Sequence, residues 1–144
     1  MNILKVGKNA KIASEQRINN ISKNKVLENF SLLIKKNANK IIFENKKDIL
    51  NAQRKGLKEN MIKRLELNSE KINQIIISIK EIIKFKDPVN YIDSQWKRPN
   101  GLKIRKVTVP LGVIGVIYES RPNVTSDVAC LCFKSGNSVI LRGG

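Results

Sequence analysis

The sequence has 144 residues, which suits about one domain, and 41% of them are hydrophobic, which excludes a disordered or fibrous chain. Its 28 basic and 12 acidic residues give a net charge of +16, but the lysines are spread along the chain. Spread charge disfavours a nucleic-acid partner. No apolar run reaches the roughly 18 residues of a membrane span, and no secretory signal is visible, so we expect a cytoplasmic protein without membrane contact.

The sequence contains no histidine, which removes histidine ligands, histidine bases and histidine-paired nucleophiles from this chain. Its two cysteines, Cys130 and Cys132, are too few for a disulfide framework and lack the second half of a zinc site, so we expect no metal site. They lie two positions apart on a predicted helix and therefore on different faces. We expect inert packing thiols in a reducing compartment, rather than redox or nucleophilic groups.

Helices are predicted across residues 1–90. Stretches near 22–34, 38–54 and 70–85 carry apolar residues at the spacing of an amphipathic helix. Gly56 marks the end of the second stretch, and a wide isoleucine stripe makes the third the most distinct. We assign these helices to core packing and not to chemistry. The predicted N-cap and apolar face of the first stretch are Ser22, Val26, Phe30, Leu33 and Ile34, and the candidate caps of the third are Asn68 and Ser69.

A β-hairpin is predicted over residues 91–109. The Pro-Asn-Gly sequence at 99–101 is a strong turn signal between strands at 94–98 and 102–109. The apolar alternation of the second strand slips by one position. A β-bulge would absorb that slip.

One parallel βαβ crossover is predicted over residues 110–144. The nearly continuous apolar run at 113–118 is typical of a strand buried on both faces. Pro122 begins the crossover helix, Gly136 ends it, and a second apolar strand follows at 138–141. Two strands cannot cover both faces of a sheet. We therefore expect one face to lack a cover, and the chain to be the front end of a larger doubly wound α/β protein.

Residues 110–144 carry a resemblance to a known family. Their most specific motifs are YESRPNVT at 118–125 and KSGNSVILRGG at 134–144. With these motifs the sequence resembles the glutamate-5-semialdehyde dehydrogenase family of the aldehyde dehydrogenase superfamily. The resemblance covers nearly all of the chain but only about the first third of the family's usual length. Three earlier segments also fit the family: AQRKGLKENMIKRLEL at 52–67, KDPV at 86–89 and NGLKIRKVTVPLG at 100–112.

The resemblance implies an α/β protein whose chain has three segments. Residues 1–90 form an N-terminal helical segment, 91–109 a β-hairpin in a region that relatives use for subunit contacts, and 110–144 the first βαβ unit of an aldehyde-dehydrogenase-like Rossmann domain that binds NADP(H). That domain is incomplete here, and the catalytic domain is absent.

The resemblance also implies a reaction. The family reduces L-glutamyl 5-phosphate with NADPH to L-glutamate 5-semialdehyde in proline biosynthesis, with glutamate 5-kinase as pathway partner and a homo-oligomer as the complete form. The family's nucleophilic cysteine lies beyond residue 144, so we expect the isolated chain to be inactive. The alternatives are a non-catalytic fragment that assembles with a separate chain, and a basic nucleic-acid-binding module.

The candidate site lies where the first strand of the crossover turns into its helix, since open α/β sheets bind ligands there. The resemblance implies that Asn123 donates its amide to the oxyanion. The alternative is a plain cap or turn residue. Glu119 and Arg121 occupy the same turn. Arg121 either meets an acyl or cofactor phosphate or pairs with an acid such as Glu119.

Arg142 follows the second strand, where relatives place a lysine that contacts the adenosine ribose. A guanidinium suits a 2′-phosphate because it donates two hydrogen bonds, although Arg142 would serve equally as a loop ion pair. Gly143 and Gly144 let the backbone approach a cofactor or form a plain turn.

Overall fold

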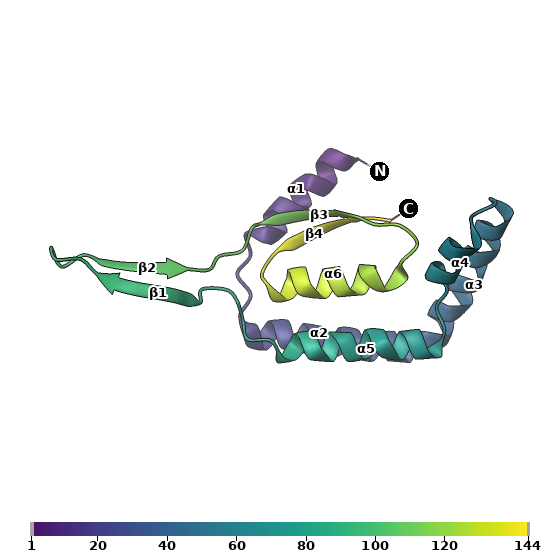
Figure 1. The fold of residues 1–144 in the computed structure, drawn as a ribbon, viewed down its shortest axis with the longest axis horizontal. Coiled ribbons are helices and arrows are strands. Elements are labelled where there is room, and N and C mark those ends of the chain that lie inside the picture. The colour runs from purple at the N-terminus through teal and green to yellow at the C-terminus, as the bar shows by residue number, and fades with distance from the viewer. Residues whose placement is uncertain (1, 144) are drawn as a thin grey trace.

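The computed structural model describes residues 2–143, which contain six helices and four strands (Figure 1). A hairpin extends from one end of the molecule, two helices form the opposite end, and the other helices stack with a parallel strand pair between them. In chain order the helices are α1 (Ile3–Ser14), α2 (Asn20–Lys36), α3 (Ala38–Arg54), α4 (Glu59–Leu65), α5 (Ser69–Lys84) and α6 (Pro122–Lys134), and the strands are β1 (Ile92–Lys97), β2 (Lys103–Val107), β3 (Val113–Ile117) and β4 (Ser138–Arg142).

Asparagine side chains begin two of the helices that build the core. The side-chain oxygen of Asn19 accepts a hydrogen bond from the amide of Ser22 at 2.8 Å, and that of Asn68 accepts one from Lys71 at 2.8 Å. Both use the extended backbone and free carbonyl oxygen that make asparagine a strong N-cap. Asn68 is confirmed as a cap. The assignment of Ser22 is wrong, because Asn19 begins α2 one turn earlier.

Helices α2 and α5 pack together, but the buried face of α2 differs from the predicted one. Val26, Phe30 and Leu33 are at least one-third exposed, and only Ile34 of the predicted set is buried. The buried face carries two polar residues, which hydrophobic spacing cannot identify. The isoleucine stripe of α5 is confirmed, with Ile79 fully buried. The buried residues of the two helices are Lys23, Leu27, Ser31 and Ile34 on α2, and Ile72, Ile75, Ile76, Ile79 and Ile82 on α5.

The predicted crossover is confirmed. Strands β3 and β4 are parallel, in register from Val113 opposite Ser138 to Ile117 opposite Arg142. Gly136 ends α6 with a φ of +74°, which favours glycine, and it lies so close to Pro110 that a Cβ there would come within 3.0 Å of the proline ring. Helix α6 lies between the strands and the α2–α5 pair (Figure 1).

The expectation that one face of the parallel pair lacks a cover is only partly correct, and the prediction that the first strand is buried on both faces is wrong, because Val113 and Ile117 of β3 stay 37% and 86% exposed. Helix α1 contacts β3 and β4, and Figure 1 shows it on the side of the strands away from α6. A groove of about 1100 Å³ remains between α1 and β4, with Val6 and Ala10 on one wall and Ile140 on the other. The covering helix comes from the opposite end of the sequence, so strand patterning could not reveal it.

The hairpin projects away from the stacked layers (Figure 1). Strands β1 and β2 are antiparallel, and the register shifts between Ile92 and Ser94, so the irregularity lies in the first strand and not in the second, where the sequence pattern slipped. Gly101 occupies the turn with a φ of +86°. Apolar side chains on the hairpin stay exposed, Trp96 at 47% among them. No helix within residues 2–143 is long and apolar enough to cross a membrane.

Two buried lysines join the helical layer to the crossover. Lys23 is 2% exposed, and its Nζ donates to both carboxylate oxygens of Asp87 at 3.1 Å. Lys134 is also 2% exposed, and its Nζ donates to the side chains of Asn20 and Asn24 and to the Ile83 carbonyl at 2.6–3.1 Å. Burial lowers the pKa of Lys134, while the negative charge of Asp87 opposes that shift. These bonds connect α2, the end of α5 and the end of α6.

We predict that Asp87→Asn lowers the free energy of unfolding by about 3 kcal/mol, because it leaves the buried Lys23 ammonium without a counter-charge. Asparagine keeps an oxygen for the Val89 amide that Asp87 also binds, so the change isolates the charge. The matched control is Asp93→Asn, which removes the exposed ion pair with Lys106 and is expected to cost about 0–1 kcal/mol. Urea denaturation of both variants measures the difference. Equal losses would contradict the role given to Asp87.

Candidate functional site

The turn from β3 into α6 is held by hydrogen bonds to two neighbouring elements. Ser120 adopts a left-handed backbone with a φ of +48°, which is uncommon for a residue with a side chain. The amide of Tyr118 donates to the Arg142 carbonyl at 3.1 Å, and the Tyr118 hydroxyl lies 2.5 Å from that of Thr125. The turn is therefore tied to the end of β4 and to the first turns of α6. Backbone conformations of this kind are concentrated at functional sites.

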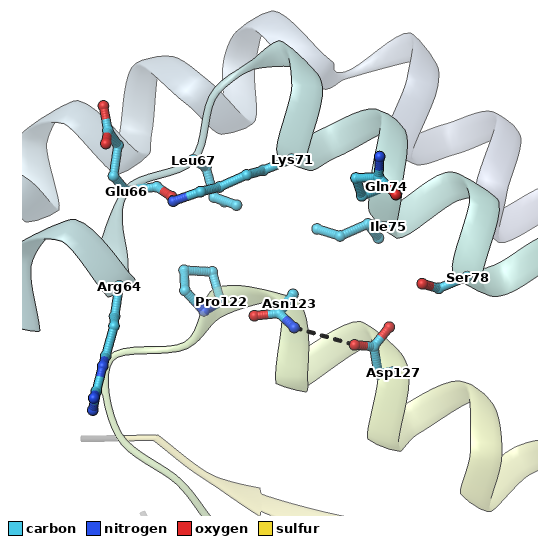
Figure 2. A pocket seen from close by; sticks show the side chains of 10 residues that line it. All are labelled: Arg64, Glu66, Leu67, Lys71, Gln74, Ile75, Ser78, Pro122, Asn123 and Asp127. Atoms are coloured by element: carbon cyan, nitrogen blue, oxygen red, sulfur yellow. Dashed lines mark hydrogen bonds between the residues drawn. The ribbon is translucent and has the colours of Figure 1, made fainter.

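Asn123 lies in the first turn of α6. It does not cap the helix, because Arg121 occupies the N-cap position and no side chain accepts a capping hydrogen bond there. One N–H of the Asn123 amide donates to Oδ2 of Asp127 at 3.3 Å (Figure 2). Asn123 is exposed, so its second amide N–H is available to a ligand.

Asn123 and Asp127 form one wall of a cleft of about 250 Å³ (Figure 2). The opposite wall is the end of α4 and one face of α5, where Lys71, Gln74 and Ser78 follow one another at helical spacing. Sequence reasoning missed this wall because it assigned α5 to packing alone. The signal was present as a polar stripe beside the isoleucine stripe. The remaining lining residues are Arg64, Glu66, Leu67, Ile75 and Pro122.

The charged groups of the cleft differ in how well they are satisfied. Lys71 Nζ donates to the carbonyl oxygens of Glu66 at 2.6 Å and Lys63 at 3.2 Å, so it also holds the end of α4. Oδ1 of Asp127 is buried and has no hydrogen-bond partner within the described part of the chain. An unsatisfied buried carboxylate oxygen is costly, which makes Asp127 the unusual group of the cleft.

Arg142 stands at the same edge of the strand pair as the β3–α6 turn, because its carbonyl binds Tyr118. Glu119, Arg121 and Arg142 are all exposed, and none of them forms an ion pair among residues 2–143. The structure therefore does not bring Arg121 and Glu119 together as a salt bridge. Gly143 lies beside the Tyr118 ring. Gly144 lies outside the described residues.

The residues at this edge fit an anionic cofactor. Two guanidinium groups without an ion-pair partner among residues 2–143, those of Arg121 and Arg142, lie at the carboxyl ends of parallel strands, where open α/β sheets bind nucleotides. Arginine donates hydrogen bonds in the fork geometry that phosphate accepts. In the described ranges, no group of three or more histidine, cysteine, aspartate or glutamate side chains could hold a metal ion.

The fold and the site define an α/β protein built on a parallel crossover with a polar cleft at the start of its helix. No family model matches the sequence. Two solved structures of gamma-glutamyl phosphate reductases superimpose on the whole chain: that from Thermotoga maritima has 36% identity, a TM-score of 0.94 and 35% of its own length covered. That from Saccharomyces cerevisiae has 34% identity, a TM-score of 0.95 and 37% covered.

Curated relatives carry the same name. The gamma-glutamyl phosphate reductase of Caldanaerobacter subterraneus subsp. tengcongensis is 49% identical over 95% of this chain and 34% of its own length. That of Listeria monocytogenes serotype 4b is 47% identical over 99% of this chain and 35% of its own length. Over nearly its whole length the chain is therefore similar to gamma-glutamyl phosphate reductases, another name for the glutamate-5-semialdehyde dehydrogenases, and it spans about a third of the length of the relatives it matches.

Neither cysteine of this chain is placed to act as a nucleophile. Cys130 belongs to the core between α6 and α5, and Cys132 is also buried. Burial, with a smaller contribution from the charge of Asp127, raises the pKa of the Cys130 thiol from 9.0 to about 11. Burial raises the pKa of Cys132 as well. Both thiols are protonated at neutral pH, and protonated thiols are poor nucleophiles.

We predict that iodoacetamide at pH 8 labels Cys130 of the folded chain at least about a hundredfold more slowly than Cys130 of the urea-unfolded chain, because a pKa two units higher lowers the thiolate fraction by about that factor. The free energy of unfolding is expected to fall as pH rises from about 9 to about 11, since the thiol ionises first in the unfolded state. Mass spectrometry of the labelled peptide gives the rates. Comparable labelling of both states would contradict the burial of the thiols.

Proposed function

We propose that this chain forms the N-terminal third of a gamma-glutamyl phosphate reductase. In this enzyme L-glutamyl 5-phosphate is reduced with NADPH to L-glutamate 5-semialdehyde and phosphate is released, as a step of proline biosynthesis. The observation that carries the proposal is the 49% identity to a curated gamma-glutamyl phosphate reductase over 95% of the chain. The substrate then comes from a glutamate 5-kinase, and the reaction takes place in the cytoplasm.

The chain's part in the reaction is to orient the acyl phosphate. The nucleophilic thiolate comes from the portion of the relatives that this chain does not span. It attacks the acyl carbon, and phosphate leaves with the electron pair of the broken C–O bond. The free amide N–H of Asn123 donates to the oxygen that becomes negative during this attack. The exposed guanidinium of Arg121 supports binding of the phosphate, since it has no ion-pair partner among the described residues.

The cofactor proposed is NADP(H), which supplies the hydride when it is bound. Arg142 holds the 2′-phosphate, and Gly143 and Gly144 let the backbone approach the nucleotide. Glu119, exposed on the β3–α6 turn, lines the same crevice. Arg142 forms no ion pair among residues 2–143, so within this part of the chain its guanidinium is open to a phosphate.

The hairpin is the surface proposed for self-association into a homo-oligomer. Its apolar side chains Ile92, Trp96 and Val107 are 41–47% exposed although they lie on paired strands. Exposed apolar groups gathered on one projecting element are typical of a protein contact.

The reaction is tested with two proteins. The isolated 144-residue chain is expected to show no turnover, because it lacks an activated nucleophile. A hybrid that joins residues 1–144 to the remaining two-thirds of the Listeria monocytogenes relative is expected to form NADPH from glutamate 5-semialdehyde, NADP⁺ and phosphate. Absorbance of NADPH measures both. A well-folded hybrid without turnover would remove the proposed reaction, and turnover by the isolated chain would overturn the assignment of Cys130 and Cys132.

In the same hybrid, Arg142→Ala is expected to lower kcat/KM for NADPH about ten- to a hundredfold and to leave that for NADH nearly unchanged. Only NADPH carries the 2′-phosphate, and a lost hydrogen bond to a charged group is worth about 1.5–3 kcal/mol. Steady-state kinetics with both cofactors provide the measurement. Arg98→Ala, in the hairpin, is the control. Equal losses for the two cofactors would show that Arg142 stabilises the loop.

A further inference from the structure

We propose that the cleft between α5 and α6 recognises the amino-acid head of the substrate. Asp127 binds the α-ammonium group, and Lys71 with Arg64 binds the α-carboxylate. The inference rests on the proposed function, since the substrate is a glutamyl compound with both charges on one carbon. It goes further by assigning specificity to residues that neither the sequence patterns nor the resemblance singled out.

Asp127 carries the first half of the argument. Its Oδ2 accepts one long hydrogen bond from Asn123, and its Oδ1 is buried without a partner within residues 2–143. This carboxylate has fewer hydrogen bonds than its oxygens can accept. Rotation about the Cβ–Cγ bond of aspartate is easy, so either oxygen can face the cleft. An ammonium group brings three N–H donors and a positive charge. It is the ligand group that satisfies Asp127 best.

The cations of the cleft carry the second half. Lys71 Nζ spends two hydrogen bonds on the Glu66 and Lys63 carbonyls, which leaves its third N–H for a ligand. Arg64 lines the same cleft and has no ion pair in the part of the chain that the structure describes. Figure 2 shows Arg64 and the Lys71 ammonium group on one side of Asn123, with the Arg64 side chain pointing away from that ammonium group, and Asp127 on the other side. A zwitterion complements this separation of charge.

The size and the remaining walls agree with a small amino acid. The cleft volume of about 250 Å³ is below the roughly 300–1,000 Å³ of pockets that take drug-sized ligands. Leu67, Ile75 and Pro122 give apolar surface for methylene groups. Asn123 lies between the two charged ends in Figure 2.

The test compares three probes that differ by one charged group. L-Glutamate carries both head-group charges, glutarate lacks the ammonium group, and 4-aminobutyrate lacks the α-carboxylate. Amide NMR spectra of the 144-residue chain are expected to shift at residues 71–78 and 123–127 with L-glutamate. Binding of the other two probes is expected to be at least about tenfold weaker. In parallel, the three probes are compared as competitive inhibitors of the hybrid enzyme, which gives a second measurement on a complete protein.

Two variants assign the charges to residues. Asp127→Asn is expected to weaken L-glutamate at least about tenfold and to leave glutarate unchanged. Arg64→Gln is expected to weaken L-glutamate and glutarate but not 4-aminobutyrate. Asp93→Asn and Arg54→Gln, which change the same residue types outside the cleft, are the matched controls. Circular dichroism verifies that each variant keeps its fold.

The outcomes separate this inference from the proposed reaction. Equal binding of the three probes, no binding of L-glutamate, or an unchanged probe preference in Asp127→Asn would overturn the head-group assignment even in an active hybrid. An inactive hybrid whose cleft still prefers L-glutamate would overturn the proposed reaction and leave the head-group assignment standing.

Discussion

Burial of two lysine ammonium groups is the constraint on which the arrangement of this structure depends. Lys23 and Lys134 are each 2% exposed, and a buried charge is tolerated only when it is paired and hydrogen-bonded. Asp87 neutralises Lys23, while two asparagines of α2 and a carbonyl oxygen at the end of α5 accept hydrogen bonds from the Lys134 ammonium group. Because these partners come from three elements, satisfying them sets α6 against the helical layer in one position.

The candidate site is a consequence of that position. The C-terminal end of α6 is held by Lys134, and the core around Cys130 holds its middle, so its first turn faces the start of α5. The cleft with Asn123 and Asp127 opens there. The same packing explains the inert thiols, since α6 is buried from two sides. The placement of Arg142 beside the β3–α6 turn has a separate origin in the parallel register of β3 and β4.

Part of the candidate site could be predicted and part could not. A general rule places ligands of open α/β sheets at the carboxyl ends of the parallel strands. This rule predicts the β3–α6 turn, with Glu119, Arg121 and Asn123, and the strand end with Arg142 as parts of the site. No comparable rule predicts that Lys71 and Asp127 belong to a site. They lie 56 positions apart, on helices whose apolar stripes explained them fully as packing elements, and only the contact of α5 with α6 makes them neighbours.

The sequence by itself determined the features that depend on near neighbours in the chain. Spacing, capping and backbone freedom over a few residues account for four features: the isoleucine stripe of α5, the Asn68 cap, the Pro-Asn-Gly turn and the end of the crossover helix at Gly136. Only the tertiary structure decided which face of α2 is buried and that α1 covers the strands. The reason is that these burials depend on distant partners. The ammonium group of Lys23 pairs with a carboxylate 64 positions away, and that of Lys134 binds two asparagines more than 100 positions away, so no local pattern predicts either burial.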